Sequence, residues 1–445
     1  MSPPAPPPID GPRSASPPLG PTLLRFLPYL WPKDRPALRL RVVAAMLLVL
    51  MSKAIAGLAM LSGLPGRDSG ADFAEPPMLA FHAAPLPPAG AAAQAAARLQ
   101  AALAGYHTLQ VSLSASPPPD YRLDIAAADP AGTGLRATLT RGGNGELLWQ
   151  KELGLAADPA LATDALAAAV AGERGLIVAD MRSRTGDSFA PGYPCSLKFY
   201  ELRLTRARSD DLGDRVRDCL ERSVALRPND APLLADLSFV RLAEAPPGED
   251  GAADRAEARR LAERALLAGP QNGYAHKALA RVYFHEGNCA RGRVSMARAA
   301  ELAPADPMVL LYGGAFLIGC GDAGGRTMLE RSIALDPDGS GQAVATLAFA
   351  DVRDGNPDGA LARLRASRAA VNPRLQFEFV RALAAIRKGD PATARAKWLA
   401  IAREVDRDPD EVTGVVARFT TIPMIAEQAA AMFATIGIGK SGQGA

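Results

Sequence analysis

The sequence predicts a mixed fold class, α+β and then all-α: one transmembrane helix, a small α/β domain and a solenoid of stacked helices. Three observations support it. An apolar run of bilayer length lies near the amino terminus, and short segments with alternating apolar residues follow it. Beyond these, glycines recur every 34 residues in a region that otherwise has helical periodicity.

The amino-terminal part divides into three segments. Residues 1–37 hold 12 of the 38 prolines and predict a disordered tail, because proline lacks the backbone donor that helices and sheets need. Residues 38–64 predict the transmembrane helix, whose apolar run from Val42 to Leu64 contains Lys53 as its only charge. Residues 65–75 form a linker. The alternative for the apolar run is a buried or amphipathic segment that does not cross a membrane.

Basic residues flank the apolar run unequally. Five of them precede it and only Arg67 closely follows it, and a basic flank stays on the cytoplasmic side. We therefore expect a single-pass inner-membrane protein, bound to the membrane through residues 38–64, with the bulk of the chain in the periplasm. The five preceding residues are Arg25, Lys33, Arg35, Arg39 and Arg41.

Residues 76–185 predict a small α/β domain. Strands are expected at 78–83, 109–115, 121–127, 135–141 and 146–153, where β-branched and aromatic residues alternate with polar ones. The turn from Gly142 to Gly145 joins the last two strands as a hairpin. Alanine-rich stretches at 90–104 and 158–171 predict the helices of this domain.

Residues 190–410 predict stacked helix pairs. Gly287, Gly321, Gly355 and Gly389 are each 34 residues apart, and 34 is the period of the tetratricopeptide repeat. Glycine suits the end of a first helix, where the backbone often becomes left-handed. Residues 411–445 are expected to form capping helices and a tail. Prolines expected to end each second helix lie at 228, 270, 304, 337, 373 and 409.

The first helices of such an array offer a binding face. Tyr274, Lys277, Arg281 and Phe284 are three or four residues apart, so they share one side of a predicted helix. Lys277 and Arg281 are candidates to bind a carboxylate or phosphate on a partner protein or peptide. The alternative is a solvated helix face.

Composition and motifs give little support to an enzyme. The chain has 50 basic and 47 acidic residues and only 5% aromatic residues, which indicates no nucleic-acid partner. No Cys-x-x-Cys or Cys/His cluster indicates a metal site, and we expect no cofactor. Residues 434–441 end in Gly-Lys-Ser, as phosphate loops do, but almost no chain remains to form the helix that such a loop opens.

Several segments resemble one bacterial family. YPCSLKFYELRL, RDCLERSVALRPND, TRGGNGELLWQKEL and the 34-residue repeats resemble the extracytoplasmic half of bacterial membrane signalling proteins, in which a TolB-like domain precedes a tetratricopeptide array. The similarity covers roughly residues 76–435. It implies a membrane-anchored, non-catalytic module for protein interaction or sensing.

A second resemblance concerns residues 23–54. They are similar to the start of a mitochondrial-type half-size ABC transporter, but the similarity ends before any nucleotide-binding domain. An ABC-transporter-related membrane component is therefore one alternative function. A nucleotide-dependent enzyme, suggested by the Gly-Lys-Ser segment, is another.

The four cysteines are expected to form two disulfides. Cys289 starts a second helix just after Gly287, and Cys320 ends the next first helix just before Gly321, so stacking brings them together. The family resemblance implies the other pair, Cys195 with Cys219. Four buried free thiols are the alternative.

Overall fold

The computed structural model describes residues 73–86, 90–112, 118–205, 210–245, 249–370 and 373–439. All of them belong to one unit of the chain, Ala71–Ala445. The predicted proline-rich tail (1–37), the predicted transmembrane segment (38–64) and most of the linker (65–75) lie outside the described residues.

The structure contradicts the predicted transmembrane helix. Within the part of the chain that it describes, no helix is both long and apolar enough to cross a membrane. The expected single-pass location in the inner membrane rested on that helix and is corrected with it. The sequence already contained an argument against this helix, because a lysine in the middle of a membrane span, such as Lys53, costs about 2.5–3.5 kcal/mol to insert.

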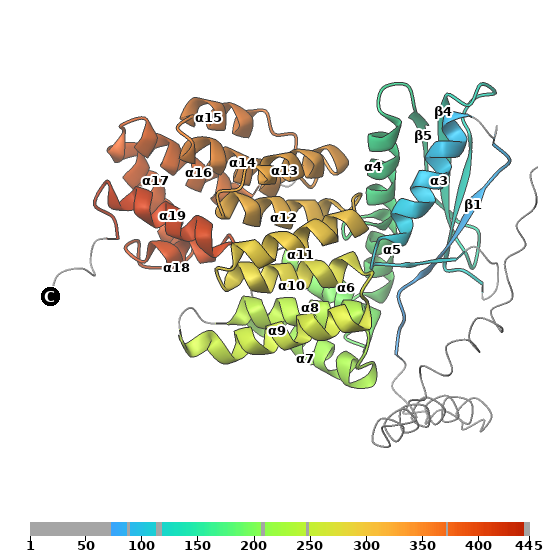
Figure 1. Ribbon diagram of the computed structural model, residues 1–445, viewed down its shortest axis with the longest axis horizontal. Helices are drawn as coiled ribbons and strands as arrows, with labels where there is room; N and C mark the ends of the chain where they lie inside the picture. Colours follow the sequence, from blue (N-terminus) through green and yellow to red (C-terminus); the bar gives the residue numbers. More distant parts are fainter. Residues whose placement is uncertain are drawn as a thin grey trace, which may run out of the picture. The chain divides into compact units, whose positions relative to one another are not determined.

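The first described elements form a five-stranded sheet with the order β2-β1-β3-β4-β5 (Figure 1). Strand β1 runs parallel to both β2 and β3, whereas β3, β4 and β5 form an antiparallel meander. A strand is present at each of the expected places, and residues 113–115 of the second expected strand lie outside the described residues. Their bounds are β1 Met78–Ala83, β2 Gln110–Ser112, β3 Tyr121–Ala127, β4 Gly134–Arg141 and β5 Leu147–Gly154.

Three helices, α3 (Ala91–Ala104), α4 (Pro159–Ala171) and α5 (Leu176–Thr185), complete this sheet domain. The strands alternate as the sequence predicted: Leu123 and Leu139 are buried against α3 and α4, while Arg122 on the other face is exposed. The sheet therefore has one helix-covered face and one polar face.

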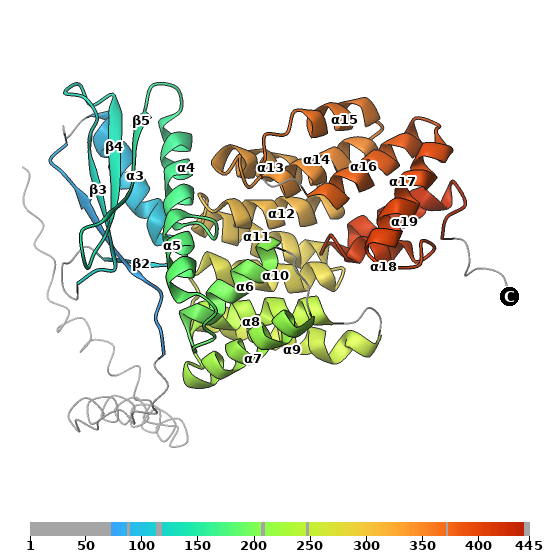
Figure 2. The ribbon, with the colours of Figure 1, turned by 180° about the vertical axis from the view of Figure 1, so that it is seen from behind.

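Six helix pairs follow among the described residues (Figures 1 and 2). The two helices of each pair pack together, and successive pairs stack in chain order, as expected of a helical solenoid. Their bounds are α6 Tyr193–Thr205 and α7 Asp210–Leu226, α8 Ala231–Glu244 and α9 Ala252–Ala268, α10 Gly273–His285 and α11 Cys289–Leu302, α12 Pro307–Gly319 and α13 Gly324–Leu335, α14 Gly341–Arg353 and α15 Pro357–Arg365, and α16 Arg374–Arg387 and α17 Pro391–Glu404.

The repeated glycines end first helices, as their spacing predicted. Gly287, Gly321, Gly355 and Gly389 all have positive φ, between 72° and 86°. At Gly287 the N–H bonds to the Phe284 carbonyl, and the Asn288 N–H reaches back to that of Tyr283, which satisfies carbonyls at the helix end. The chain can therefore reverse into the second helix within three or four residues.

The repeated prolines match second-helix ends less regularly. Four of them lie two residues after α7, α9, α11 and α13. Pro373 and Pro409 lie farther on, because α15 already ends at Arg365 and α17 at Glu404. Aspartate or asparagine caps also fix several starts: Asp306, for example, accepts N–H bonds from Met308 and Val309 before α12.

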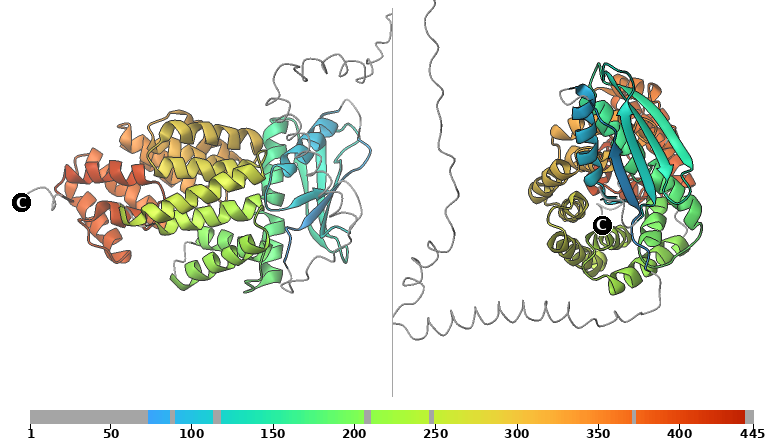
Figure 3. Two further views of the ribbon diagram at one scale, coloured as in Figure 1. Left: turned by 60° about the horizontal axis from the view of Figure 1, so that its bottom comes forward. Right: turned by 90° about the vertical axis from the view of Figure 1, so that its right-hand side faces the viewer.

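The sheet domain packs against the helix pairs through α4 and the loop after α3 (Figure 3). Asp164 of α4 is buried and pairs with Arg98 of α3 and Arg331 of α13. Tyr106, in the loop, donates its hydroxyl hydrogen bond to the Ala305 carbonyl before α12. These contacts make the sheet domain and the array one continuous body of packed residues.

Two short helices, α18 (Val412–Ala417) and α19 (Pro423–Ala434), occupy the range where capping helices were expected. They fold back on the array: Gln428 donates to the Gly319 carbonyl at 2.7 Å, and Gln376 of α16 donates to that of Phe419. Phe433 is fully buried against Trp398, with ring centroids 4.2 Å apart. The carboxyl-terminal segment thus covers the apolar end of the last pair.

Candidate binding site

The predicted binding residues of α10 do not form one open face. Tyr274, Lys277 and Phe284 are at most 2% exposed, and Arg281 is 6% exposed. Lys277 faces the loops of the sheet domain instead of solvent, because Glu173 and His107 from those loops approach this side of the helix. All four residues are therefore buried, and the alternative of a solvated helix face does not describe them.

Phe284 belongs to the core of the array. Its ring stacks on Phe316 of α12 with centroids 4.9 Å apart and planes within 4°. Gly292 of α11 faces the same ring so closely that an added Cβ would lie 2.6 Å from it. Phe284 therefore joins neighbouring helix pairs.

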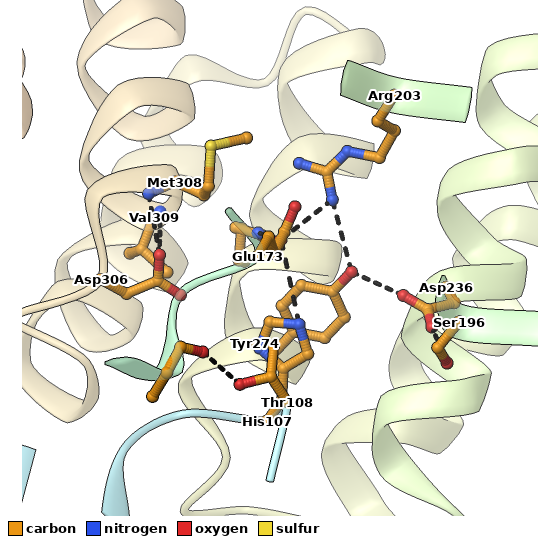
Figure 4. Close-up of polar contacts among 12 residues, drawn as sticks. His107, Thr108, Glu173, Ser196, Arg203, Asp236, Tyr274, Asp306, Met308 and Val309 are labelled. Carbon is orange, nitrogen blue, oxygen red and sulfur yellow. Dashed lines mark hydrogen bonds and ion pairs between the residues drawn. The ribbon is translucent and has the colours of Figure 1, made fainter. Parts of the chain in front are cut away.

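Glu173 is the centre of a buried charged cluster (Figure 4). This residue lies between α4 and α5 and is 1% exposed. Its Oε1 is 3.2 Å from Arg203 of α6 and 3.5 Å from Nζ of Lys277. Two cations of the helical array therefore share one carboxylate of the sheet domain.

Burial and charge act against each other on this cluster. Burial alone would raise the pKa of Glu173, but Arg203 and Lys277 outweigh it and lower this pKa to about 2. Burial lowers the pKa of Lys277, although Glu173 opposes that shift. Glu173 is thus held ionised at any physiological pH.

His107 fills the space beside Glu173. Its ring stacks on that of Tyr274 with centroids 3.5 Å apart, and its Nε2 is 3.9 Å from Oε1 of Glu173. Burial lowers the pKa of His107 to about 3. The imidazole therefore packs as a neutral ring and does not work as a proton donor near neutral pH.

Asp236 of α8 continues the network through Tyr274. The Tyr274 hydroxyl donates to Oδ1 at 2.6 Å and the Ser196 hydroxyl to Oδ2 at 2.6 Å (Figure 4). Burial raises the pKa of Asp236 to about 7, although both hydrogen bonds act in the opposite direction. Helices α6, α8 and α10 are thereby tied together by polar contacts inside the array.

A cavity of about 550 Å³ adjoins this cluster. We call it the inner cavity. It is lined by the first helices α6, α8, α10 and α12, by α7, and by residues 417–421 at the end of α18. Segments more than 200 residues apart in sequence therefore line one space, whose volume is typical of a ligand pocket.

The walls of the inner cavity combine aromatic rings with arginines. The guanidinium of Arg203 lies 5.2 Å from the ring centroid of Phe199 and 4.9 Å from that of Tyr312. Arg281 lies 5.2 Å from the centroid of Phe239. Cations packed on ring faces keep their charge while their flat sides are shielded from water.

The two expected disulfide pairs are present in the structure. Cys195 of α6 bonds to Cys219 of α7, with Cα atoms 5.6 Å apart, and Cys289 of α11 bonds to Cys320 after α12, at 6.1 Å. The first bond lies within a helix pair and the second joins neighbouring pairs. The first bond fixes two helices that line the inner cavity, and the second ties the end of α12, which also lines it, to α11.

Neither the cluster nor other described residues group as metal ligands: within the described ranges there is no set of three or more His, Cys, Asp or Glu side chains that could hold a metal ion. The Gly-Lys-Ser segment lies after α19 and ends outside the described residues.

No protein-family model matches the chain, and a search of curated proteins finds no match either.

Sequence reasoning missed most of the cluster. Four members were not among the predicted site residues: His107, Glu173, Arg203 and Asp236. A usable signal was the charged Glu173 and Arg174 directly after a helix of nearly all apolar residues. Such charges at the end of a buried helix need partners, and only the fold shows which residues provide them.

Proposed function

We propose that this chain is a non-catalytic protein-interaction module, a tetratricopeptide-type array with an amino-terminal sheet domain, which holds a peptide segment of its partner in the inner cavity. The observation that carries the proposal is the inner cavity itself. It lies on the first helices of the stacked pairs, where such arrays present their binding surface, and its volume accommodates a few residues.

The lining supports recognition of a protein segment. Phe199, Phe239 and Tyr312 offer apolar surface, while Arg203 and Arg281 offer charged donors beside it. Aromatic and arginine side chains are the residues that contribute most at protein interfaces. Buried salt bridges and two disulfides keep this lining in place, so little order must be gained on binding.

The titrating groups favour binding over catalysis. A general acid or base works best with a pKa near the working pH. Glu173 and His107, with pKa values of about 2 and about 3, are far from that range. Asp236 is near neutrality, but it is fully buried and both of its oxygens already accept hydrogen bonds from the protein.

Filling the inner cavity tests this proposal. Ala243 of α8 lines the cavity with an exposed side chain, so Ala243→Trp blocks the space without disturbing a core. Ala297 of α11 is also an exposed helical alanine but does not line the cavity, and Ala297→Trp is the matched control.

The full chain is immobilised and incubated with a random heptapeptide pool, and retained peptides are identified by mass spectrometry. We expect the wild type and Ala297→Trp to retain the same sequences, and Ala243→Trp to lose them. Equal retention by all three proteins would contradict the proposed function.

A further inference from the structure

The carboxyl-terminal segment, defined here as residues 411–439, reaches well beyond the last helix pair. A cap needs to cover only α16 and α17, yet α19 also packs against α12, two pairs earlier (Figure 2). Ile422 and Met424 lie so close to Gly319 at the end of α12 that a Cβ added to this glycine would be 3.1 Å and 3.3 Å from them. Residues 417–421 of the same segment line the inner cavity.

The segment lies on first helices, which are where an array of this type presents its binding surface. Gln428 donates a hydrogen bond to the Gly319 carbonyl of α12 at 2.7 Å. The ring of Phe419 lies 5.3 Å, between centroids, from that of Phe379 of α16. The chain therefore covers part of its own binding face and closes one side of the inner cavity.

Helix α19 has the pattern of a helix that docks in a groove. Ile425, Ala429 and Phe433 are four residues apart and buried, whereas Glu427 and Ala431 on the other side are exposed. An amphipathic helix laid on an apolar surface is a common mode of recognition between proteins. The segment thus shows which chemistry this face accepts: a helix with apolar residues at positions i, i+4 and i+8.

The segment is held less completely than the two helices of a pair hold each other. Helix α19 packs less extensively against α16 and α12 than α17 does against α16. The Oε1 atoms of Gln376 and Gln428 are buried at this contact, and neither has a hydrogen-bond partner among the described residues. Buried polar atoms without partners cost free energy, and sparsely packed segments open most readily. Release of the segment therefore costs less than unfolding of the array.

The connection from α17 to α18 allows such a release. Asp406, Arg407 and Asp408 are exposed, and Asp406 turns the chain with a φ of 51°. Nε1 of Trp398 donates to the Pro409 carbonyl at 2.8 Å, which attaches the connection to the array. The chain after Pro409 can leave its place without disturbing the core of a helix pair.

We propose that the carboxyl-terminal segment is an internal ligand that regulates access to the binding face. While docked, it limits the inner cavity to a few residues of a partner. Its release opens a groove for an amphipathic helix of a partner protein with apolar residues at positions i, i+4 and i+8. This inference rests on the proposed function, because it concerns the regulation of the same cavity.

The substitution Ile422→Asp undocks the segment while α19 keeps its helical form. Ile422 is the N-cap residue of α19 and makes no side-chain capping bond, whereas aspartate caps helices well. Its charge, however, cannot be buried against Gly319 without a partner. Ala431→Asp is the matched control, because it adds the same charge to the exposed side of the same helix.

Amide hydrogen exchange of the full chain, followed by mass spectrometry, measures the release itself. We expect residues 412–434 of the wild type to exchange faster than α16 and α17. Ile422→Asp should speed that exchange at least tenfold further, because burial of an isoleucine is worth more than a tenfold change in an equilibrium, and Ala431→Asp should not. Exchange of residues 412–434 at the rate of α16 and α17 in all three proteins would show a fixed cap and overturn the inference.

A fluorescent synthetic peptide of residues 411–439 is the probe for the opened face. By fluorescence anisotropy we expect it to bind Ile422→Asp at least tenfold more tightly than the wild type or Ala431→Asp, in which the attached segment competes at a high effective concentration. Gly319→Leu, added to Ile422→Asp, fills the contact from the side of the array and should abolish this binding. Equal binding to all four proteins would contradict the proposal.

The heptapeptide experiment separates failure of this inference from failure of the proposed function. If Ala243→Trp abolishes heptapeptide retention but Ile422→Asp changes neither exchange nor binding of the probe, the interaction module stands and its regulation by the segment falls. If Ile422→Asp acts as expected but Ala243→Trp retains the heptapeptides, the peptide site in the inner cavity falls, although the segment is displaceable.

Discussion

Two regions of the molecule are held together by different means. Where the sheet domain meets α6 and α10, buried charges meet: Glu173 pairs with Arg203 and Lys277 at 1–10% side-chain exposure. Farther along the array, neighbouring pairs meet through stacked rings, such as Phe349 on Phe379 with planes within 9°. Ring packing tolerates small shifts, whereas buried charges demand one arrangement. We therefore expect the buried charges at the junction to fix the position of the inner cavity's wall, and the stacked rings to contribute mainly to the stability of the array.

The largest effect is expected at the junction. Glu173→Gln leaves Arg203 and Lys277 buried without a carboxylate, and breaking such a pair destabilises by about 3–5 kcal/mol. The control is Glu404→Gln, which breaks an exposed pair with Arg374 and should cost less than about 1 kcal/mol. Urea unfolding followed by circular dichroism measures both. Equal losses would show that the junction charges contribute no more than surface ones.

The disulfides lie in both regions, so they test whether covalent bonds matter equally in each. Replacing Cys195 and Cys219 together by serine, or Cys289 and Cys320 together, should each lower unfolding stability by about 2–4 kcal/mol. The loops closed are of similar length, 24 and 31 residues apart in sequence, so the two losses should be similar. Peptide mapping by mass spectrometry without reductant shows directly whether the two disulfides form. Four free thiols in native protein would contradict both bonds.

The ring-packed region should respond to a single methyl group. Gly292→Ala places a Cβ against the Phe284 ring, and overpacking of this kind costs about 1–3 kcal/mol. Gly213 of α7 is also helical but has open space around it, so Gly213→Ala should stabilise by about 1 kcal/mol. Thermal unfolding distinguishes the two signs. Stabilisation by both substitutions would mean that the contact between α10 and α11 is loose.

The smallest effect concerns pH. The pKa of Asp236 is raised to about 7 in the folded protein, so its contribution to stability is full below about pH 4 and disappears as the pH rises through 7. His107 and His285, with pKa values of about 3, act in the opposite direction below pH 6.5. The informative quantity is therefore the difference in free energy of unfolding between the wild type and Asp236→Asn. The variant retains both histidines, so their contribution cancels.

Between pH 5 and 8, the wild type should lose stability relative to Asp236→Asn as the pH rises, by at most about 1.4 kcal/mol per pH unit. Urea midpoints at several pH values measure it, and Asp250→Asn, at an exposed position in the short 3-10 helix Glu249–Gly251, is the control. A wild type and an Asp236→Asn variant with parallel pH profiles would show that Asp236 keeps an ordinary pKa.

The sequence predicted the ring-packed region far better than the junction, for a physical reason. Gly287 and Gly321 mark helix ends by local backbone geometry, so their spacing alone revealed the helix pairs. The pairing of Cys289 with Cys320 followed from the same stacking. Such features depend on residues within one or two repeats and leave a periodic pattern.

The junction depends on residues without any such pattern. Glu173 is 30 residues from Arg203, and His107 and Lys277 come from still more distant segments. Helical spacing placed Lys277 on one side of its helix with Tyr274 and Arg281, but its burial could not be foreseen because the covering loops belong to another domain.

Photo-crosslinking tests the central proposal, that the inner cavity holds a peptide, most directly. A peptide retained by the wild type is resynthesised with a benzophenone group, irradiated with the full chain and mapped by mass spectrometry. The account predicts attachment to Phe239, Val240, Ala243 or Glu244 of α8, or to residues 417–421 at the end of α18, all of which line the cavity, and none in Ala243→Trp. Attachment instead to the second helices α11 and α13 or to the sheet, unchanged in Ala243→Trp, would contradict it.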